Sequence, residues 1–328
     1  MTSVHLVIAG FALLIIGGEL LVRGAVRTAE QLGVSPLLIG ITLVGFGTSA
    51  PEMAISIQAA ASGSPGIAVG NFVGSCISNI LLILGLSALI APVAVTSNAL
   101  SRDGTVVLLT ALAFTAVGIF LPFDRFVGAV FLLWLVSYLV YAVRQERVAG
   151  REGHPAPFQK AEAYQLSRRR RLLDRVRRGM VHGYPIVAAV AGLVVIVYGG
   201  RLLVDGAVEL AREYNVSEEV IGLTIVAIGT SMPEFVTSLV AAVRGQAAVA
   251  VGNILGSNIY NILAVGGATA LVTPTMVPAR IAWYDNLVML TASIVLVIFA
   301  RSGARISRLE GTILFLGYIA YIASLWPR

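Results

Sequence analysis

The chain has 328 residues, of which 57% are hydrophobic and only 12% are charged, with a net charge of +6. A soluble globular protein carries about a quarter charged residues, so this composition excludes a soluble domain and predicts a membrane protein. The only cysteine, Cys76, excludes an intramolecular disulfide and a multi-cysteine metal site. The only lysine, Lys160, is not part of a Gly-Lys-Ser/Thr phosphate loop, so the chain lacks the usual machinery of ATP-driven pumping.

Ten apolar stretches follow one another along the chain, and a bilayer span needs about 20 such residues. They are Val4–Val22, Leu37–Ala61, Gly66–Ala91, Gly104–Leu121, Phe126–Val143, Tyr184–Val204, Val220–Val243, Ala247–Val272, Asn286–Ala300 and Gly311–Trp326. The first stretch lacks the charged start and the cleavage site of a signal peptide, so it is predicted to be a span. The ten stretches together predict an all-α integral membrane protein.

The chain is an internal duplication. A shift of 182 residues aligns Gly17–Pro92 with Gly199–Pro274 without a gap, and 38 of the 76 aligned positions are identical. Each copy holds five spans, and this odd number makes the second copy enter the membrane from the opposite face. We therefore predict ten transmembrane helices arranged as two inverted five-helix repeats, residues 1–143 and 184–328.

A basic linker at residues 144–183 joins the two repeats. Its basic residues include Arg144, Arg147, Arg168, Arg169, Arg170, Arg171, Arg175, Arg177 and Arg178. Cytoplasmic loops are enriched in arginine and lysine, so we expect a cytoplasmic linker and extracytoplasmic termini in the cell (inner) membrane. Because this topology accounts for the positive charge, the lipid bilayer is the expected partner, with no nucleic acid and no implied protein partner.

Identity between the repeats concentrates in two polar blocks that lie inside apolar spans. The first block is Gly47-Thr48-Ser49-Ala50-Pro51-Glu52, which matches Gly229-Thr230-Ser231-Met232-Pro233-Glu234. The second block is Gly70–Asn79, which matches Gly252–Asn261. Drift in a lipid-facing helix would favour apolar replacements, so the retained polar residues indicate a shared functional demand.

Glu52 and Glu234 are the central residues of this pattern. Each lies near the middle of its span, where an ionised carboxylate costs several kcal/mol unless it is compensated. Neither span has a lysine or arginine nearby, and the four core spans offer only Arg244, at a span end. A bound cation is therefore the predicted countercharge.

Pro51 and Pro233 are predicted to break their helices, because proline cannot donate to the carbonyl four residues earlier. Carbonyl oxygens freed in this way inside a membrane line cavities and are suitable ligands for Na⁺ or Ca²⁺. All the gathered donors are oxygens, which hard cations prefer. Of the three histidines, His5 lies at the edge of the first span and His154 and His182 lie in the linker, so a copper or zinc site is not predicted.

A structural explanation also fits the first block. Ser49 and Glu52, like Ser231 and Glu234, have the spacing of a capping box. A glutamine would cap the helix without a buried charge, and capping leaves the second block unexplained, so a cation site is the preferred interpretation and the two roles can coexist. Six glycines inside the spans are attributed to close helix packing: Gly40, Gly70, Gly74, Gly222, Gly252 and Gly256.

The paired blocks resemble the two α-repeats of the cation/calcium exchanger superfamily. The sequence Gly-Thr-Ser-x-Pro-Glu in both halves is similar to the sodium/calcium exchanger branch of prokaryotic type, whereas proton-coupled relatives typically carry Gly-Asn-x-x-Glu. The resemblance implies a calcium site made by Thr48, Glu52, Thr230 and Glu234. It also implies ligands for Na⁺, or shared by both ions, at Gly45, Ser49, Ser75, Asn79, Ala227, Ser231, Ser257 and Asn261.

The same resemblance implies an antiporter that exchanges Na⁺ for Ca²⁺ by alternating access. Its transported ions are Na⁺ and Ca²⁺, and no cofactor is expected. Potassium-dependent relatives carry aspartate where this chain has Asn261, so we expect no K⁺ co-transport. Two carboxylates are neutralised by one Ca²⁺, whereas three Na⁺ leave about one excess positive charge, so electrogenic exchange is expected.

Two other functions remain open from the residues themselves. The same glutamates could carry protons in an H⁺/Ca²⁺ antiporter, and buried carboxylates beside broken helices are also compatible with a passive cation channel. An enzyme is not predicted, because the spans contain no nucleophile and base in a catalytic arrangement and no metal-binding histidines.

Overall fold

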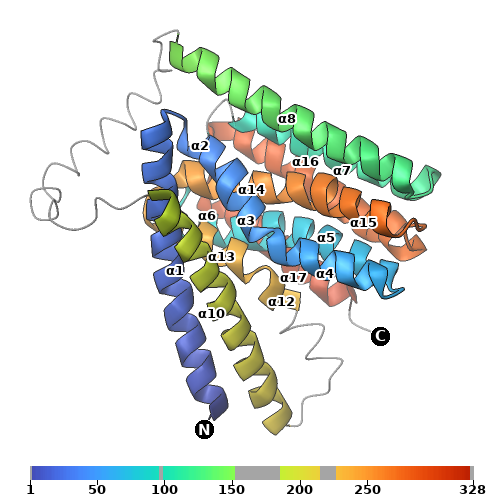
Figure 1. The fold of residues 1–328 in the computed structure, drawn as a ribbon, viewed down its shortest axis with the longest axis horizontal. Coiled ribbons are helices and arrows are strands. Elements are labelled where there is room, and N and C mark those ends of the chain that lie inside the picture. Colours follow the sequence, from blue (N-terminus) through green and yellow to red (C-terminus); the bar gives the residue numbers. More distant parts are fainter. Residues whose placement is uncertain (1, 96–98, 152–184, 215–226, 326–328) are drawn as a thin grey trace, which may run out of the picture.

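The computed structural model describes residues 2–95, 99–151, 185–214 and 227–325, and nearly all of them are helical (Figure 1). Within these ranges, eight helices are long and apolar enough to cross a membrane, and one bent pair, Pro36–Thr48 with Ala50–Ala61, makes a ninth span. The predicted span Val220–Val243 lies partly outside the described residues. The prediction of an all-α membrane protein is confirmed.

The elements of the two halves are as follows, with η marking a π-helix. The first half contains α1 (Thr2–Leu32), α2 (Pro36–Ile39), η1 (Gly40–Val44), α3 (Gly45–Thr48), α4 (Ala50–Ala61), α5 (Pro65–Ser78), η2 (Asn79–Leu84), α6 (Gly85–Ile90), β1 (Val93–Ala94), η3 (Ala99–Gly104), α7 (Thr105–Phe120) and α8 (Arg125–Arg151). The second contains α10 (Pro185–Glu213), α12 (Ala227–Thr230), α13 (Met232–Val243), α14 (Ala247–Tyr260), η5 (Asn261–Gly266), α15 (Gly267–Val272), η6 (Ile281–Asp285), α16 (Asn286–Gly303), β2 (Arg305–Ile306) and α17 (Arg308–Leu325).

The sequence duplication is matched by duplicated secondary structure. Helices α4 and α13 begin and end 182 residues apart, and so do α5 and α14, η2 and η5, and α6 and α15. The two short strands are antiparallel, with Val93 opposite Ile306. Helix α8 runs to Arg151 and so continues into the predicted linker, most of which lies outside the described residues.

Each helix breaks in the turn that precedes its proline. The first break is at Ser49, with φ −81° and ψ 1°, and the helices on its two sides are bent by 41°. Ser231 takes the same place in the second half, with φ −90° and ψ 10°. Pro51 and Pro233 each sit in the first turn of the following helix, because a proline is tolerated where the N–H has no intrahelical partner.

Helices α1 and α10 form an antiparallel pair beside the other helices (Figure 1). Gly10 faces Leu203, and Gly24 faces Ala189 at the other end of the contact. A Cβ atom built on Gly24 would lie 2.4 Å from the backbone nitrogen of Ala189. Glycine therefore permits this close approach, as is common between membrane helices.

Other glycines divide into two groups. Gly40, Gly252 and Gly256 lie against backbone atoms of a neighbouring helix, at 2.6–3.0 Å from an added Cβ, as predicted. The packing explanation is wrong for Gly70, whose nearest atom would be 3.8 Å away, and for Gly74, which has nothing within 4 Å. Gly222 lies outside the described residues.

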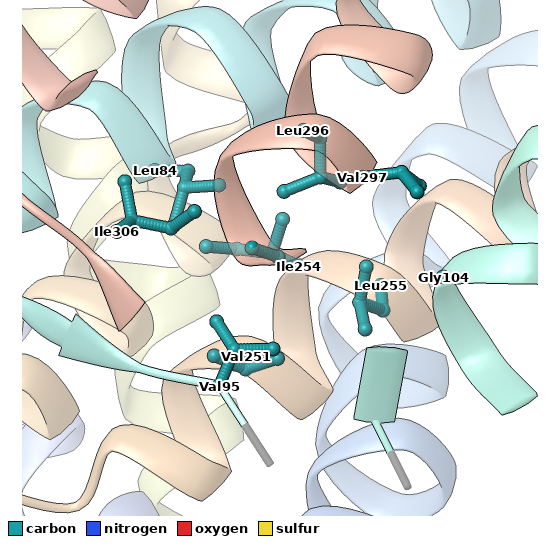
Figure 2. A pocket seen from close by; sticks show the side chains of 10 residues that line it. Leu84, Val95, Gly104, Val251, Ile254, Leu255, Leu296, Val297 and Ile306 are labelled. Carbon is teal, nitrogen blue, oxygen red and sulfur yellow. The ribbon is translucent and has the colours of Figure 1, made fainter. Parts of the chain in front are cut away.

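Buried apolar side chains form two clusters. The larger one fills the body of the protein and includes the edge-packed rings of Phe72, Phe114 and Phe123. The smaller one joins the α1 and α10 pair to the rest, with Leu21 and Ile196 among its members. An apolar cavity beside α14 and α16 is lined by residues such as Leu84, Ile254 and Leu296 (Figure 2).

A hydrogen bond between tyrosine and aspartate occurs in both halves, buried in the first half and partly buried in the second. The hydroxyl of Tyr138 donates to Asp103 at 2.8 Å, and that of Tyr321 donates to Asp285 at 2.9 Å. Asp103 and Asp285 are 182 residues apart, the same shift that relates the two repeats, while Tyr138 and Tyr321 are 183 apart. Because α8 holds η3 in one half and α17 holds η6 in the other, these bonds tie equivalent elements together.

In the first half an arginine joins this arrangement. Arg102 binds Asp103 through two hydrogen bonds of 2.6 and 3.0 Å, and it lies 3.7 Å from Glu146. Glu146 accepts hydrogen bonds from the main chain and the hydroxyl of Ser35, at the start of α2. This Arg102 cluster, which consists of Arg102, Asp103, Glu146, Ser35 and Tyr138, connects α2, η3 and α8.

Candidate cation-binding site

The two predicted glutamates occupy equivalent places just after the two helix breaks. Glu52 lies in the first turn of α4 and Glu234 in the first turn of α13. Their exposed fractions are 0% and 1%, and Ser49, three residues before Glu52, reaches the Glu234 carboxylate with its hydroxyl. The fold thus brings the central acidic residues of both halves into one buried region.

These carboxylates lack compensating partners among the described residues. Both carboxylate oxygens of Glu52 and the Oε2 atom of Glu234 have no hydrogen-bond partner there. Arg244, the basic residue that the core spans offer, binds Glu19 of α1 at 2.8 Å instead. A buried ionised carboxylate needs compensation by an opposite charge, so the site is suited to a cation.

Serine hydroxyls at the helix breaks contact the other half of the protein. The Ser49 hydroxyl donates to Oε1 of Glu234 at 3.4 Å, and the hydroxyls of Ser75 and Ser231 lie 3.4 Å apart. Neither Ser49 nor Ser231 caps its own helix with its side chain. The capping-box explanation is therefore not supported, and the hydroxyls line the region around the glutamates.

Thr48 joins a second group of oxygens across the two halves. Its hydroxyl lies 3.3 Å from the hydroxyl of Ser257 and 3.1 Å from the side-chain oxygen of Asn253, and it also contacts the Gly45 carbonyl at 3.3 Å. All four residues are buried. Because Ser257 and Asn253 lie on α14, Thr48 fixes α3 against that helix.

Asn79 and Asn261 begin the π-helices η2 and η5 and are buried. Neither amide has a hydrogen-bond partner within the described part of the chain, through either its oxygen or its nitrogen. A buried polar group without a partner is costly, and an amide oxygen is a ligand that Na⁺ and Ca²⁺ accept. These two residues therefore fit the donor set predicted for them.

The remaining predicted residues are less fully placed. Thr230 is half-buried at the end of α12. Ala227 is the first residue of the same helix, and the structure does not describe how exposed it is.

Two asparagines that sequence reasoning did not single out also belong to this region. Asn71 and Asn253 each contact the glutamate of their own half. The signal was available, because both lie in the second block of repeat identity.

A soft-metal centre finds no support in the described ranges, where no group of three or more His, Cys, Asp or Glu side chains could hold a metal ion. The buried thiol of Cys76 lies 3.7 Å from the Asn258 carbonyl oxygen, to which it donates a weak hydrogen bond. The cavity of Figure 2 offers no oxygen ligands, since the side chains that line it are apolar. The oxygens around Glu52 and Glu234 are thus the candidate cation site.

Comparison with known proteins identifies the family. The sodium/calcium exchanger protein family matches residues 2–144 and 184–326, which together make up most of the chain. The chain belongs to this family. It is therefore an ion-transporting membrane protein, and not an enzyme.

Individual relatives agree with the family assignment. The chain is 31% identical to the sodium/calcium exchanger MaX1 of Methanosarcina acetivorans, over 98% of this chain and 97% of that protein. It is 35% identical to the inner membrane protein YrbG of Escherichia coli, over 98% and 96% of the two chains. Among solved structures, the sodium-calcium exchanger NCX_Mj soaked with 2.5 mM Na⁺ and 0.1 mM Ca²⁺ superposes with a TM-score of 0.82 at 32% identity, covering 100% of this chain and 99% of that one.

Proposed function

We propose that the protein exchanges Na⁺ for Ca²⁺ across the cell membrane by alternating access. The observation that carries this proposal is the pair of buried glutamates, which have no positively charged partner among the described residues and lie near hydroxyl, amide and carbonyl oxygens. Calcium would bind Glu52, Glu234, Thr48 and Thr230. Sodium would use these groups together with Gly45, Ser49, Ser75, Asn79, Ala227, Ser231, Ser257 and Asn261. Because the two ions need overlapping oxygens, each excludes the other, which couples their movements.

The proposed architecture is ten spans in two inverted repeats, residues 1–143 and 184–328. It is supported by the 182-residue recurrence of the helices and by the antiparallel packing of the equivalent helices α1 and α10. In this arrangement the basic linker, residues 144–183, is cytoplasmic and both termini are extracytoplasmic.

Counter-ion dependence is the direct test of this function. Radioactive calcium should enter proteoliposomes loaded with Na⁺ and should not enter liposomes loaded with K⁺, because only outward sodium movement drives the exchange. A third set, with a proton gradient and no Na⁺, tests the H⁺/Ca²⁺ antiporter. Uptake driven by protons and indifferent to Na⁺ would contradict sodium coupling, and calcium entry without any counter-ion gradient would indicate a channel.

The exchange should also respond to membrane potential. If three Na⁺ leave for each Ca²⁺ that enters, about one positive charge moves outward per cycle, and a potential of 100 mV acting on one charge is worth ~2.3 kcal/mol. External K⁺ with valinomycin makes Na⁺-loaded liposomes positive inside, and this should accelerate calcium uptake. An inside-negative potential should slow it. Equal rates at both potentials would show that exchange is electroneutral.

Potassium should be neither required nor transported. Both halves carry a neutral asparagine, Asn79 or Asn261, at the start of their π-helices. Among the residues that the structure describes, the candidate site therefore has two carboxylates and no third to balance an additional cation.

A further inference from the structure

Asn71 holds the first turn of α4 from the neighbouring helix α5. Its side-chain amide nitrogen donates to the main-chain carbonyl of Glu52 at 3.2 Å and to the hydroxyl of Ser56 at 2.9 Å. Glu52 and Ser56 are four residues apart and therefore share a face of α4. The two protons of one amide group thus bind adjacent turns of the helix that carries the glutamate.

Asn253 makes the same two bonds in the second half. Its amide nitrogen lies 3.2 Å from the Glu234 carbonyl oxygen and 2.9 Å from the Ser238 hydroxyl. The two halves have diverged at half of the aligned positions, yet this arrangement is the same in both. Asn253 and Ser238 are fully buried, so loss of these bonds would leave polar groups unsatisfied.

Asn253 has an additional role, because it links the two halves. Its side-chain oxygen accepts a hydrogen bond from Thr48 at 3.1 Å. One side chain on α14 therefore contacts a proposed calcium ligand of the first half, Thr48, and holds the helix turn that carries a proposed ligand of the second half, Glu234.

We propose that Asn71 and Asn253 are positioning residues of the exchange site. A helix that rotates about its axis would break both bonds to the asparagine, so each asparagine fixes the direction in which the carboxylate of Glu52 or Glu234 points. Asn253 also fixes the separation between Glu234 and Thr48. This inference rests on the proposed exchange function, since it takes these residues as cation ligands. Outer partners that orient metal ligands typically contribute 10–100-fold to metal affinity.

The test compares Asn253→Ala with Asn258→Ala. Asn258 is a matched control because it lies on α14, is 1% exposed and donates only within its own helix, to the Ile254 carbonyl at 3.0 Å. In the purified full-length protein, Asn253→Ala should weaken Ca²⁺ binding about tenfold or more, measured by calorimetry. In proteoliposomes, the KM for Ca²⁺ should rise by the same factor, with a smaller loss of maximal rate. Asn258→Ala should stay within about twofold of the wild type for both quantities.

If Asn253 only stabilised the fold, the two alanine variants would change calcium affinity by the same factor. Equal shifts in calcium affinity for Asn253→Ala and Asn258→Ala, or no shift for Asn253→Ala, would overturn the proposal. If Asn253→Ala fails to fold, Ser238→Ala removes one of its hydrogen-bond partners and should weaken calcium binding in the same direction. A normal calcium affinity for Ser238→Ala would then overturn the proposal.

Because calorimetry measures calcium binding without transport, it tests the positioning role of the asparagines independently of Na⁺/Ca²⁺ exchange. A wild-type protein that binds Ca²⁺ but shows no Na⁺-driven uptake would contradict sodium exchange, while the affinity comparison would still test the positioning role.

Discussion

Replacement of Glu52 or Glu234 by glutamine should abolish Na⁺-driven calcium uptake, with a loss of at least about a hundredfold, or ~3 kcal/mol. Glutamine keeps the size of the side chain but removes one of the two negative charges of the site. A bound Ca²⁺ would then carry an uncompensated positive charge inside the membrane, where charges cost several kcal/mol. Calcium uptake into Na⁺-loaded proteoliposomes measures the loss for each variant.

Stability measurements distinguish this loss from misfolding. Both carboxylates are buried and lack charged partners among the described residues, so the neutral glutamine should leave the unfolding temperature of the ion-free protein unchanged or higher. The rise of that temperature on adding Ca²⁺ should disappear, because a ligand stabilises only the state that binds it. Glu209→Gln, an exposed carboxylate on α10, is the matched control and should retain both uptake and calcium stabilisation. Near-normal uptake in Glu52→Gln or Glu234→Gln would refute the proposed ligand set.

Arg102→Met should destabilise the protein by about 3–5 kcal/mol, which is the range for breaking a buried ion pair from one side. The variant leaves Asp103, which is 0% exposed, and the largely buried Glu146 without their positive partner. It also loosens the contact between α8 and the start of α2, because Glu146 binds Ser35. Thermal unfolding in detergent, followed by intrinsic fluorescence, should show a clearly lower transition temperature.

Two control variants test whether the unpaired buried charge causes the loss of stability in Arg102→Met. Tyr138→Phe removes one hydrogen bond to Asp103 and should cost only about 1 kcal/mol. Arg301→Met, at an exposed arginine on α16, should leave the transition temperature nearly unchanged. A transition temperature for Arg102→Met as high as that for Arg301→Met would show that the Arg102 cluster contributes little to stability.

The sequence alone predicted the membrane class, the duplication and the residues at the centre of the candidate site. Hydropathy locates the spans because a lipid-facing helix must be apolar along its whole length. The exceptions inside the spans, such as Glu52, Glu234 and the prolines before them, stand out for the same reason. The bend itself lies at Ser49, within the turn before Pro51, because a helix tolerates proline in its first turn.

Tertiary structure alone decided which groups meet. Ser49 contacts Glu234, and Thr48 contacts Asn253 and Ser257, across separations of 185 to 209 residues. Local periodicity reports which face of a helix is apolar, but it carries no information about which distant helix packs against a given polar residue. Asn71 and Asn253 were visible only as members of an identical block, and the role of Asp103 was not visible at all. Their functions depend on hydrogen bonds between helices, and the packing of those helices sets the distances that make such bonds possible.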